Sequence, residues 1–118
     1  MGHITNLGKP ELESMLDDII DMNEGGFIDT LLAQAASDAT REDMMSDYII
    51  TMTRYYMYLK AYQLEEDYEM CAKIQKAIGL EEAHYLGIIT QFCAWSQPKA
   101  DKQLIKEIRN EFRSIYNV

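Results

Sequence analysis

The hydrophobic and polar positions of this chain follow the period of an α-helix along most of its length. The longest such stretch, residues 40–64, contains neither glycine nor proline. One apolar set recurs at alternating spacings of three and four, on a single stripe of a helix: Met45, Tyr48, Met52, Tyr55, Leu59 and Tyr62. A second set widens that stripe: Ile49, Ile50, Tyr56, Met57 and Leu64. A helix that is apolar over most of its circumference must be covered on several sides. We therefore expect residues 41–64 to form the central helix of a bundle.

The same periodicity predicts helices before this stretch. Pro10 suits the first turn of a helix that ends at the glycine pair Gly25 and Gly26. A shorter helix is predicted over residues 27–36, with its apolar residues turned inward. The first nine residues carry no periodic pattern and are expected to be an irregular lead-in.

Three further helices are predicted after the central one. Asp67 is the expected N-cap of a helix that stops at Gly79, a residue type that favours helix C-termini. Glu81 begins the next helix, which runs to Trp95, and the last helix covers residues 101–116. Together the elements predict an all-α fold, a compact helical bundle of five or six helices forming a single domain over residues 10–118.

Composition supports a globular chain inside the cell. The 118 residues suit one domain, and a hydrophobic content of 47% argues against global disorder. No apolar run approaches the roughly 20 residues that cross a bilayer, and the N-terminus has no secretion signal. Cys71 and Cys93 lie on the apolar sides of predicted helices, as reduced core cysteines do. We therefore expect a cytoplasmic protein that does not enter a membrane.

The charge is distributed unevenly. The net charge is −9, but residues 1–98 carry −11 while residues 99–118 carry +2. A strongly acidic body repels phosphate backbones and disfavours a conventional nucleic-acid-binding domain. This acidic charge favours association with basic partners or increases the solubility of the protein.

Residues 59–80 contain a pattern of small, acidic and apolar positions around an acidic turn: Ala61, Asp67, Tyr68, Glu69, Ala72, Ile74 and Ile78. This pattern resembles the UVR motif, a helical hairpin found at the C-terminus of the excision-repair B subunit and in adaptor proteins of bacterial Clp proteases. Cys71 replaces the first alanine of the motif, and Gln75 and Lys76 replace its Arg-Asp pair. The resemblance implies a protein–protein docking element without chemistry of its own.

Two residues of the predicted helix 81–95 resemble half of a metal site. Glu81 and His84 form a Glu-x-x-His pair, which supplies two ligands in ferritin-like di-iron proteins. A full site needs a second such pair and two further glutamates, so it would have to be assembled across a dimer. The alternative is that Glu81 complements the helix dipole and His84 is a polar boundary residue. The spacing of Cys71, His84 and Cys93 fits no standard zinc site, and no cofactor is predicted.

Tyrosines are concentrated in the central helix, where five occur within 15 residues. They are either core residues whose hydroxyls reach polar partners or anchors of a protein interface. Base stacking would need a cationic groove beside them. The candidate interface residues are Tyr55, Tyr56, Tyr58 and Tyr62.

The last helix has a segregated row of cations. Lys99, Lys102, Lys106, Arg109 and Arg113 recur at spacings of three, four, three and four, beside an apolar face. Such a row binds an acidic partner, nucleic acid or an anionic membrane, packs on the acidic helices of the same chain, or is simply solvated. Only about 3–5 phosphates would be neutralised, so any binding of nucleic acid would be weak and salt-sensitive.

These observations favour a small acidic, non-enzymatic interaction protein. It would act as an adaptor, inhibitor or regulator by docking helix faces, with homodimer formation as a corollary. This composition is typical of small regulators encoded by phages and mobile elements. Two alternatives stay open: a ferritin-like metal-binding oxidoreductase assembled across a dimer, and weak nucleic-acid binding through the basic C-terminal helix.

Overall fold

The described part of the chain is entirely helical. The computed structural model describes residues 8–24, 41–91 and 97–118. These residues form four α-helices and no strand, namely α2 (Lys9–Glu24), α4 (Arg41–Leu64), α5 (Tyr68–Gln91) and α6 (Pro98–Tyr116). The predicted all-α class is confirmed. The helix predicted over residues 27–36 lies outside the described residues.

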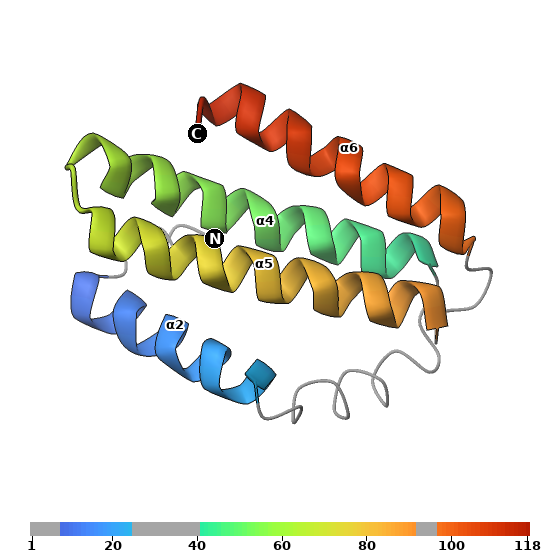
Figure 1. Ribbon diagram of the computed structural model, residues 1–118, viewed down its shortest axis with the longest axis horizontal. Coiled ribbons are helices and arrows are strands. Elements are labelled where there is room, and N and C mark those ends of the chain that lie inside the picture. The colour runs from blue at the N-terminus through green and yellow to red at the C-terminus, as the bar shows by residue number, and fades with distance from the viewer. Residues whose placement is uncertain (1–7, 25–40, 92–96) are drawn as a thin grey trace.

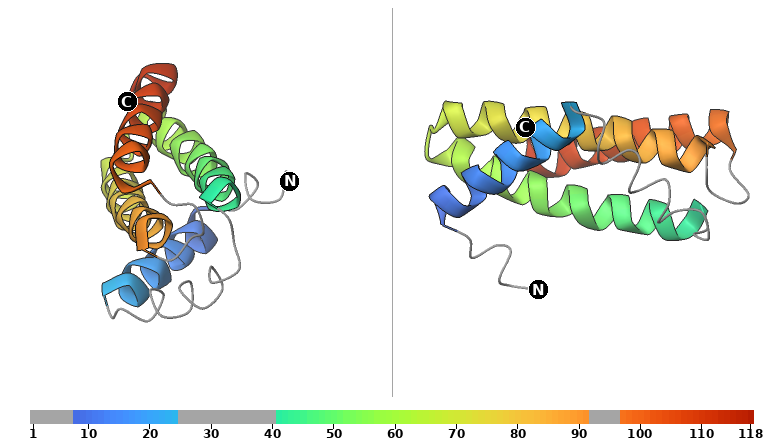
Figure 2. Two further views of the ribbon diagram at one scale, coloured as in Figure 1. Left: turned by 90° about the vertical axis from the view of Figure 1, so that its right-hand side faces the viewer. Right: turned by 90° about the horizontal axis from the view of Figure 1, so that it is seen from below.

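The helices pack as a bundle in which consecutive described helices run in opposite directions (Figure 1). α4 and α5 form an antiparallel hairpin, with α6 on one side of this pair and α2 on the other. The end-on view in Figure 2 shows the same arrangement. α6 therefore runs parallel to α4 and antiparallel to α5.

The number of helices and the helix at the centre both differ from prediction. The described residues hold four helices rather than five or six, because α5 continues through Gly79 where a helix end was predicted. One glycine disfavours a helix by only about 1 kcal/mol relative to alanine. Buried residues on both sides of it, Ile74 and Ile78 before and Tyr85 and Ile89 after, hold α5 as one 24-residue helix. α5 packs against α2, α4 and α6, and so occupies the centre that was predicted for residues 41–64.

The turn between α4 and α5 is closed by hydrogen bonds at both helix ends. The amides of Glu66 and Asp67 donate to the carbonyls of Gln63 and Tyr62 at 3.1 and 3.0 Å. This pair of bonds is the Schellman arrangement that satisfies the last carbonyls of a helix. Asp67 Oδ1 then accepts from the Met70 amide at 3.3 Å, which confirms Asp67 as the N-cap of α5.

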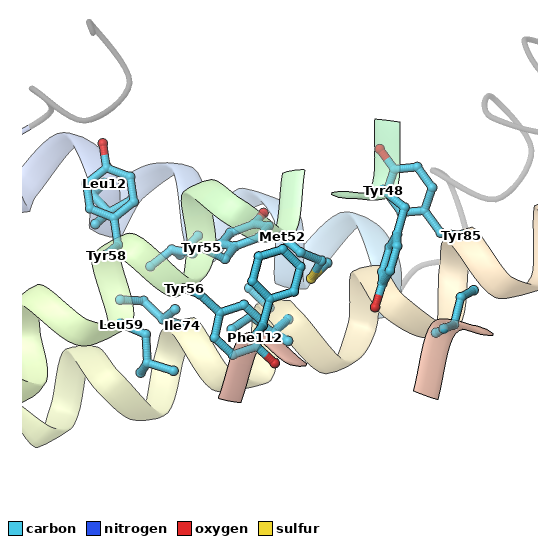
Figure 3. Close-up of a cluster of buried hydrophobic side chains, with 14 of the residues drawn as sticks. Leu12, Tyr48, Met52, Tyr55, Tyr56, Tyr58, Leu59, Ile74, Tyr85 and Phe112 are labelled. Carbon is cyan, nitrogen blue, oxygen red and sulfur yellow. The ribbon is translucent and has the colours of Figure 1, made fainter. Parts of the chain in front are cut away.

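The hydrophobic core lies where α4 and α5 face each other and extends under α2 and α6 (Figure 3). α2 contributes Leu12 and Leu16, both with no exposed surface, and α6 contributes Ile105 and Phe112. No helix in the described ranges combines the length and apolarity that a membrane span requires.

Candidate functional site

The start of α6 is fixed by a buried carboxylate. Pro98 occupies the first helical position, where a missing amide costs nothing, and Asp101 in the first turn has no exposed surface. Asp101 Oδ2 accepts from the Gln97 amide at 3.0 Å, and Oδ1 accepts from the Arg41 guanidinium at the start of α4. The side chain of Arg41 is 19% exposed, so this ion pair is largely shielded from water. The pair ties the N-terminal ends of α4 and α6 together.

The C-terminal half of α6 is held by aromatic packing. The ring of Phe112 stacks on Tyr56 of α4 at a centroid distance of 5.0 Å and an interplanar angle of 2°. Tyr116 extends this stack on the same two rings. An ion pair holds one end of α6 and stacked aromatic rings hold the other, so the orientation of α6 about its own axis is fixed. Its two flanks therefore face defined neighbours: α5 on one side and α4 on the other.

A cationic seam follows the flank of α6 that faces α5, and we define it by Lys99, Lys102, Lys106, Arg109 and Arg113. Two hollows of the α5–α6 groove contain most of these residues, Arg109 and Arg113 in one and Lys99 and Lys102 in the other. Four of the five cations predicted from sequence therefore line these two hollows, and Lys106 lies between Lys102 and Arg109 along the chain.

The five cations of the seam differ in their partners. Arg109 Nη1 donates to Glu82 Oε1 of α5 at 2.7 Å, and Tyr48 of α4 donates to the other oxygen of Glu82 at 3.5 Å. Arg113 donates to the hydroxyl of Tyr56, and this contact opposes the rise that burial causes in the pKa of that phenol. Lys99, Lys102 and Lys106 are exposed, and within the described residues they make no ion pair.

An apolar face lies on the other flank of α6. We define it by Ile49 of α4 and by Leu104, Ile108 and Ile115 of α6, which line one groove. This groove of about 650 Å³ between the two helices is also lined by Phe112. Two of these four side chains stay substantially exposed among the described residues, Ile49 at 41% and Ile115 at 69%. Ile50 and Met57 are also exposed on α4, but they do not line this groove. The second apolar set of residues 41–64 is thus only partly covered.

The candidate tyrosines are core residues. Tyr55, Tyr56 and Tyr58, which Figure 3 shows within the core cluster, are 5%, 2% and 7% exposed. Tyr62 is half-buried. The hydroxyl of Tyr55 donates to the Glu81 carboxyl, and the ring of Tyr48 packs edge-on against Tyr85 at 5.7 Å. Their burial accounts for the tyrosine-rich composition of α4 without a partner. The apolar face defined above contains none of them.

Glu81 and His84, the candidate half of a metal site, are both at least partly buried on α5. Burial raises the pKa of the Glu81 carboxyl, and its hydrogen bond from Tyr55 opposes that rise. His84 is only 6% exposed. In the described ranges no three His, Cys, Asp or Glu side chains come close enough to form a metal site. Cys71 is buried, which raises the pKa of its thiol, and Cys93 lies outside the described residues.

The segment that resembles the UVR motif forms the closed end of the α4–α5 hairpin. Ile74 and Ile78 are buried between the helices, whereas Ala61 and Ala72 are exposed and Tyr68 is 67% exposed. The resemblance to the UVR motif stays a prediction. Comparison with protein-family models, curated proteins and solved structures gave no significant match.

Two residues that the sequence did not single out organise this region. Asp101 in the first turn of α6 is the buried partner of Arg41. Glu82 joins α4, α5 and α6 through Tyr48 and Arg109. Their partners lie 27 to 60 residues away along the chain, a separation at which no local spacing rule applies.

Proposed function

We propose that this protein is a small non-enzymatic interaction protein that docks an amphipathic helix of a partner protein. The observation that carries the proposal is the apolar face, which α4 and α6 build together and the described residues leave partly exposed. Contiguous exposed apolar surface of this kind typically marks a site of protein association. An adaptor, an inhibitor or a regulator would each use such a surface.

The dimensions of the apolar face suit a helix. From Leu104 to Ile115 the face extends for about 17 Å along α6, at 1.5 Å per residue. Its α6 residues repeat at helical spacing, and Ile49 lines the groove from the parallel helix α4. A third helix laid along the groove would place apolar side chains between them. Leu, Ile and Met anchors spaced three and four apart are the expected partner chemistry. Glu107 and Glu111 line the same groove and would favour basic residues at the rim of the partner helix.

Site-specific photo-crosslinking in the native host tests the proposal. A photoreactive residue at Ile115, on the apolar face, is expected to give a discrete protein adduct. The same residue at Gln103, an exposed position of α6 that lies outside this groove, is the matched control. The apolar-face variant Ile49→Lys should remove the Ile115 adduct. Equal crosslinking at both positions, or none at either, would contradict the proposal.

Two further measurements separate the alternatives. Light scattering coupled to size-exclusion chromatography would reveal whether a second copy of this chain covers the apolar face, in which case the Ile115 adduct would be a homodimer. Metal analysis after expression with added iron and manganese tests the ferritin-like alternative, which requires a stoichiometric metal. A bound metal would overturn the non-enzymatic assignment.

A further inference from the structure

We infer that the cationic seam binds an acidic helical segment of a partner protein, alongside the α5–α6 groove. The inference rests on the proposed docking function and specifies a second contact surface, separate from the apolar face. Four of its five cations are exposed and make no ion pair within the described chain, although one of them, Arg113, donates to the Tyr56 hydroxyl. This concentration of positive charge stands out in a chain whose net charge is −9.

The groove beside the cationic seam has one charged wall, formed by α6, and one nearly neutral wall, formed by α5. The α5 wall is lined by Gly79, Ala83, Leu86, Gly87 and Thr90, and Glu82 is the acid that faces the seam from this helix. Glu82 is already bound to Arg109. The acids of α6 do not compensate either, because Asp101 is buried against Arg41 while Glu107 and Glu111 line the groove on the α4 side. An occupant would therefore meet uncompensated lysines along one side.

The spacing of the cations suits a partner segment that is an α-helix. The seam extends for about 21 Å from Lys99 to Arg113, and its charges repeat every three or four residues. Glutamates or aspartates at the same spacing on an antiparallel or parallel helix repeat with the same pitch of about 5.4 Å, so several pairs can form at once. Leu86 and Ile78, which line the two hollows, supply apolar contacts for the same occupant.

The acidic body favours a short polypeptide over nucleic acid. A long polyanion bound at the seam would pass the remaining surface of the molecule, where residues 1–98 carry −11. A helical segment of four to five turns is confined to the seam and avoids that repulsion, which acts over about 10 Å at ordinary salt. Steering by the seam would speed association and fix the orientation of the partner more than it would add affinity.

A pair of synthetic peptides tests the inference on the full-length protein. One 16-residue peptide carries glutamates three and four apart on one face of a helix, with leucines beside them. The second has the same composition in an order that spreads the glutamates around the helix. Binding is followed by amide chemical shifts of the labelled protein in about 50 mM and about 500 mM NaCl. We expect the phased peptide to bind several-fold more tightly at low salt and to shift the amides of Gly79, Ala83 and Gly87.

Charge-reversal variants supply the control. Lys102→Glu and Lys106→Glu should each weaken binding by about two- to fivefold, the range of single exposed charge pairs. Lys60→Glu makes the same charge change on α4, outside the cationic seam of α6, and should change binding less than twofold. All three side chains lie at the surface or are half-buried, so the fold should persist, which circular dichroism verifies.

Several results would overturn the inference. Equal affinity for the two peptides would show that the seam does not select glutamates arranged on one face of a helix. Amide chemical-shift changes outside the seam would show that the peptide binds elsewhere. Tighter binding of an oligonucleotide of the same charge would assign the seam to nucleic acid. Self-association that Lys102→Glu abolishes would assign it to a second copy. Failure of the peptides together with a specific Ile115 adduct would reject the seam alone, whereas loss of both would reject the proposed function.

Discussion

Glu66, in the turn between α4 and α5, has a backbone conformation that glutamate rarely adopts. Its φ of 58° lies in the left-handed region, where a Cβ atom crowds the backbone. The position is the C′ residue of the Schellman turn, which helices most often fill with glycine. The turn is thus built with correct hydrogen bonds but an unfavourable residue.

We expect Glu66→Gly to stabilise the protein by about 0.5–1 kcal/mol. Relief of the left-handed strain stabilises the folded state by more than the added conformational entropy of glycine stabilises the unfolded chain. Urea denaturation followed by circular dichroism measures the change. Glu66→Ala keeps a Cβ and should leave the free energy of unfolding almost unchanged, so equal stabilisation by both variants would contradict the strain explanation.

Glu81 makes the stability of the protein depend on pH. Burial raises the pKa of its carboxyl in the folded state, so the folded protein holds this proton more tightly than the unfolded chain. The resulting stabilisation is fully present below the unfolded pKa and is lost as the pH rises through the folded pKa. Each unit of elevation corresponds to about 1.4 kcal/mol lost at neutral pH.

The variant Glu81→Gln removes this titration. It keeps an oxygen that accepts the Tyr55 hydrogen bond. We therefore expect the variant to be more stable than the wild type at pH 7, and we expect this difference in the free energy of unfolding to be smaller at pH 4. Urea midpoints across that range measure the difference. Glu111→Gln, at an exposed position of α6, is the control. Parallel pH profiles for wild type and Glu81→Gln would show that the buried carboxyl is not responsible.

The tyrosines show what residue patterns predict and what they leave open. Helical spacing correctly placed Tyr48 and Tyr55 on a buried stripe. Composition alone could not decide between a core and an interface for Tyr56 and Tyr58, because both uses require the same amphipathic ring. The decision depends on neighbours such as Phe112, which stacks on Tyr56 from another helix and lies 56 residues farther along the chain.

At the scale of elements, a buried ion pair attaches the N-terminal end of α6 to α4. Asp101→Ala should destabilise the protein by about 2 kcal/mol, because it removes a fully buried hydrogen-bonded carboxylate and leaves the Arg41 guanidinium without that acceptor. A double-mutant cycle with Arg41→Ala, measured by urea denaturation, isolates the coupling. Additive effects of the two substitutions would mean that the pair does not fasten α6.

Helix boundaries were predictable where a local cap determines them. Asp67 caps α5 through the Met70 amide, as the capping rule predicted. The predicted start of the last helix at residue 101 was three residues late, because Pro98 occupies the first turn of α6. The predicted helix end at Gly79 was wrong for a physical reason: tertiary packing on both sides of a glycine outweighs its weak helix propensity. Pairings such as Glu82 with Arg109 join residues that are distant in sequence, and they follow only from the assembled bundle.

At the scale of the whole molecule, local stability should be highest in α5. This helix contacts the three other described helices, and Ile74 and Ile89 near its two ends have no exposed surface. Native-state hydrogen exchange should therefore find the slowest amides in α5 and faster exchange in α2 and the C-terminal half of α6. Slower exchange in α6 than in α5 would contradict the central position of α5.

The ion pairs that hold α2 and α6 have a consequence for the order of assembly. Arg41 and Asp101 are 60 residues apart in the chain, as are Lys73 and Glu13, so each contact closes a long loop against chain entropy. The α4–α5 hairpin forms through a short turn, and once formed it shortens the effective length of both loops. We therefore expect α4 and α5 to associate first and the two outer helices to dock afterwards. Kinetic φ-values should be high for Ile74→Val and low for Asp101→Ala, and the reverse pattern would exclude this sequence of events.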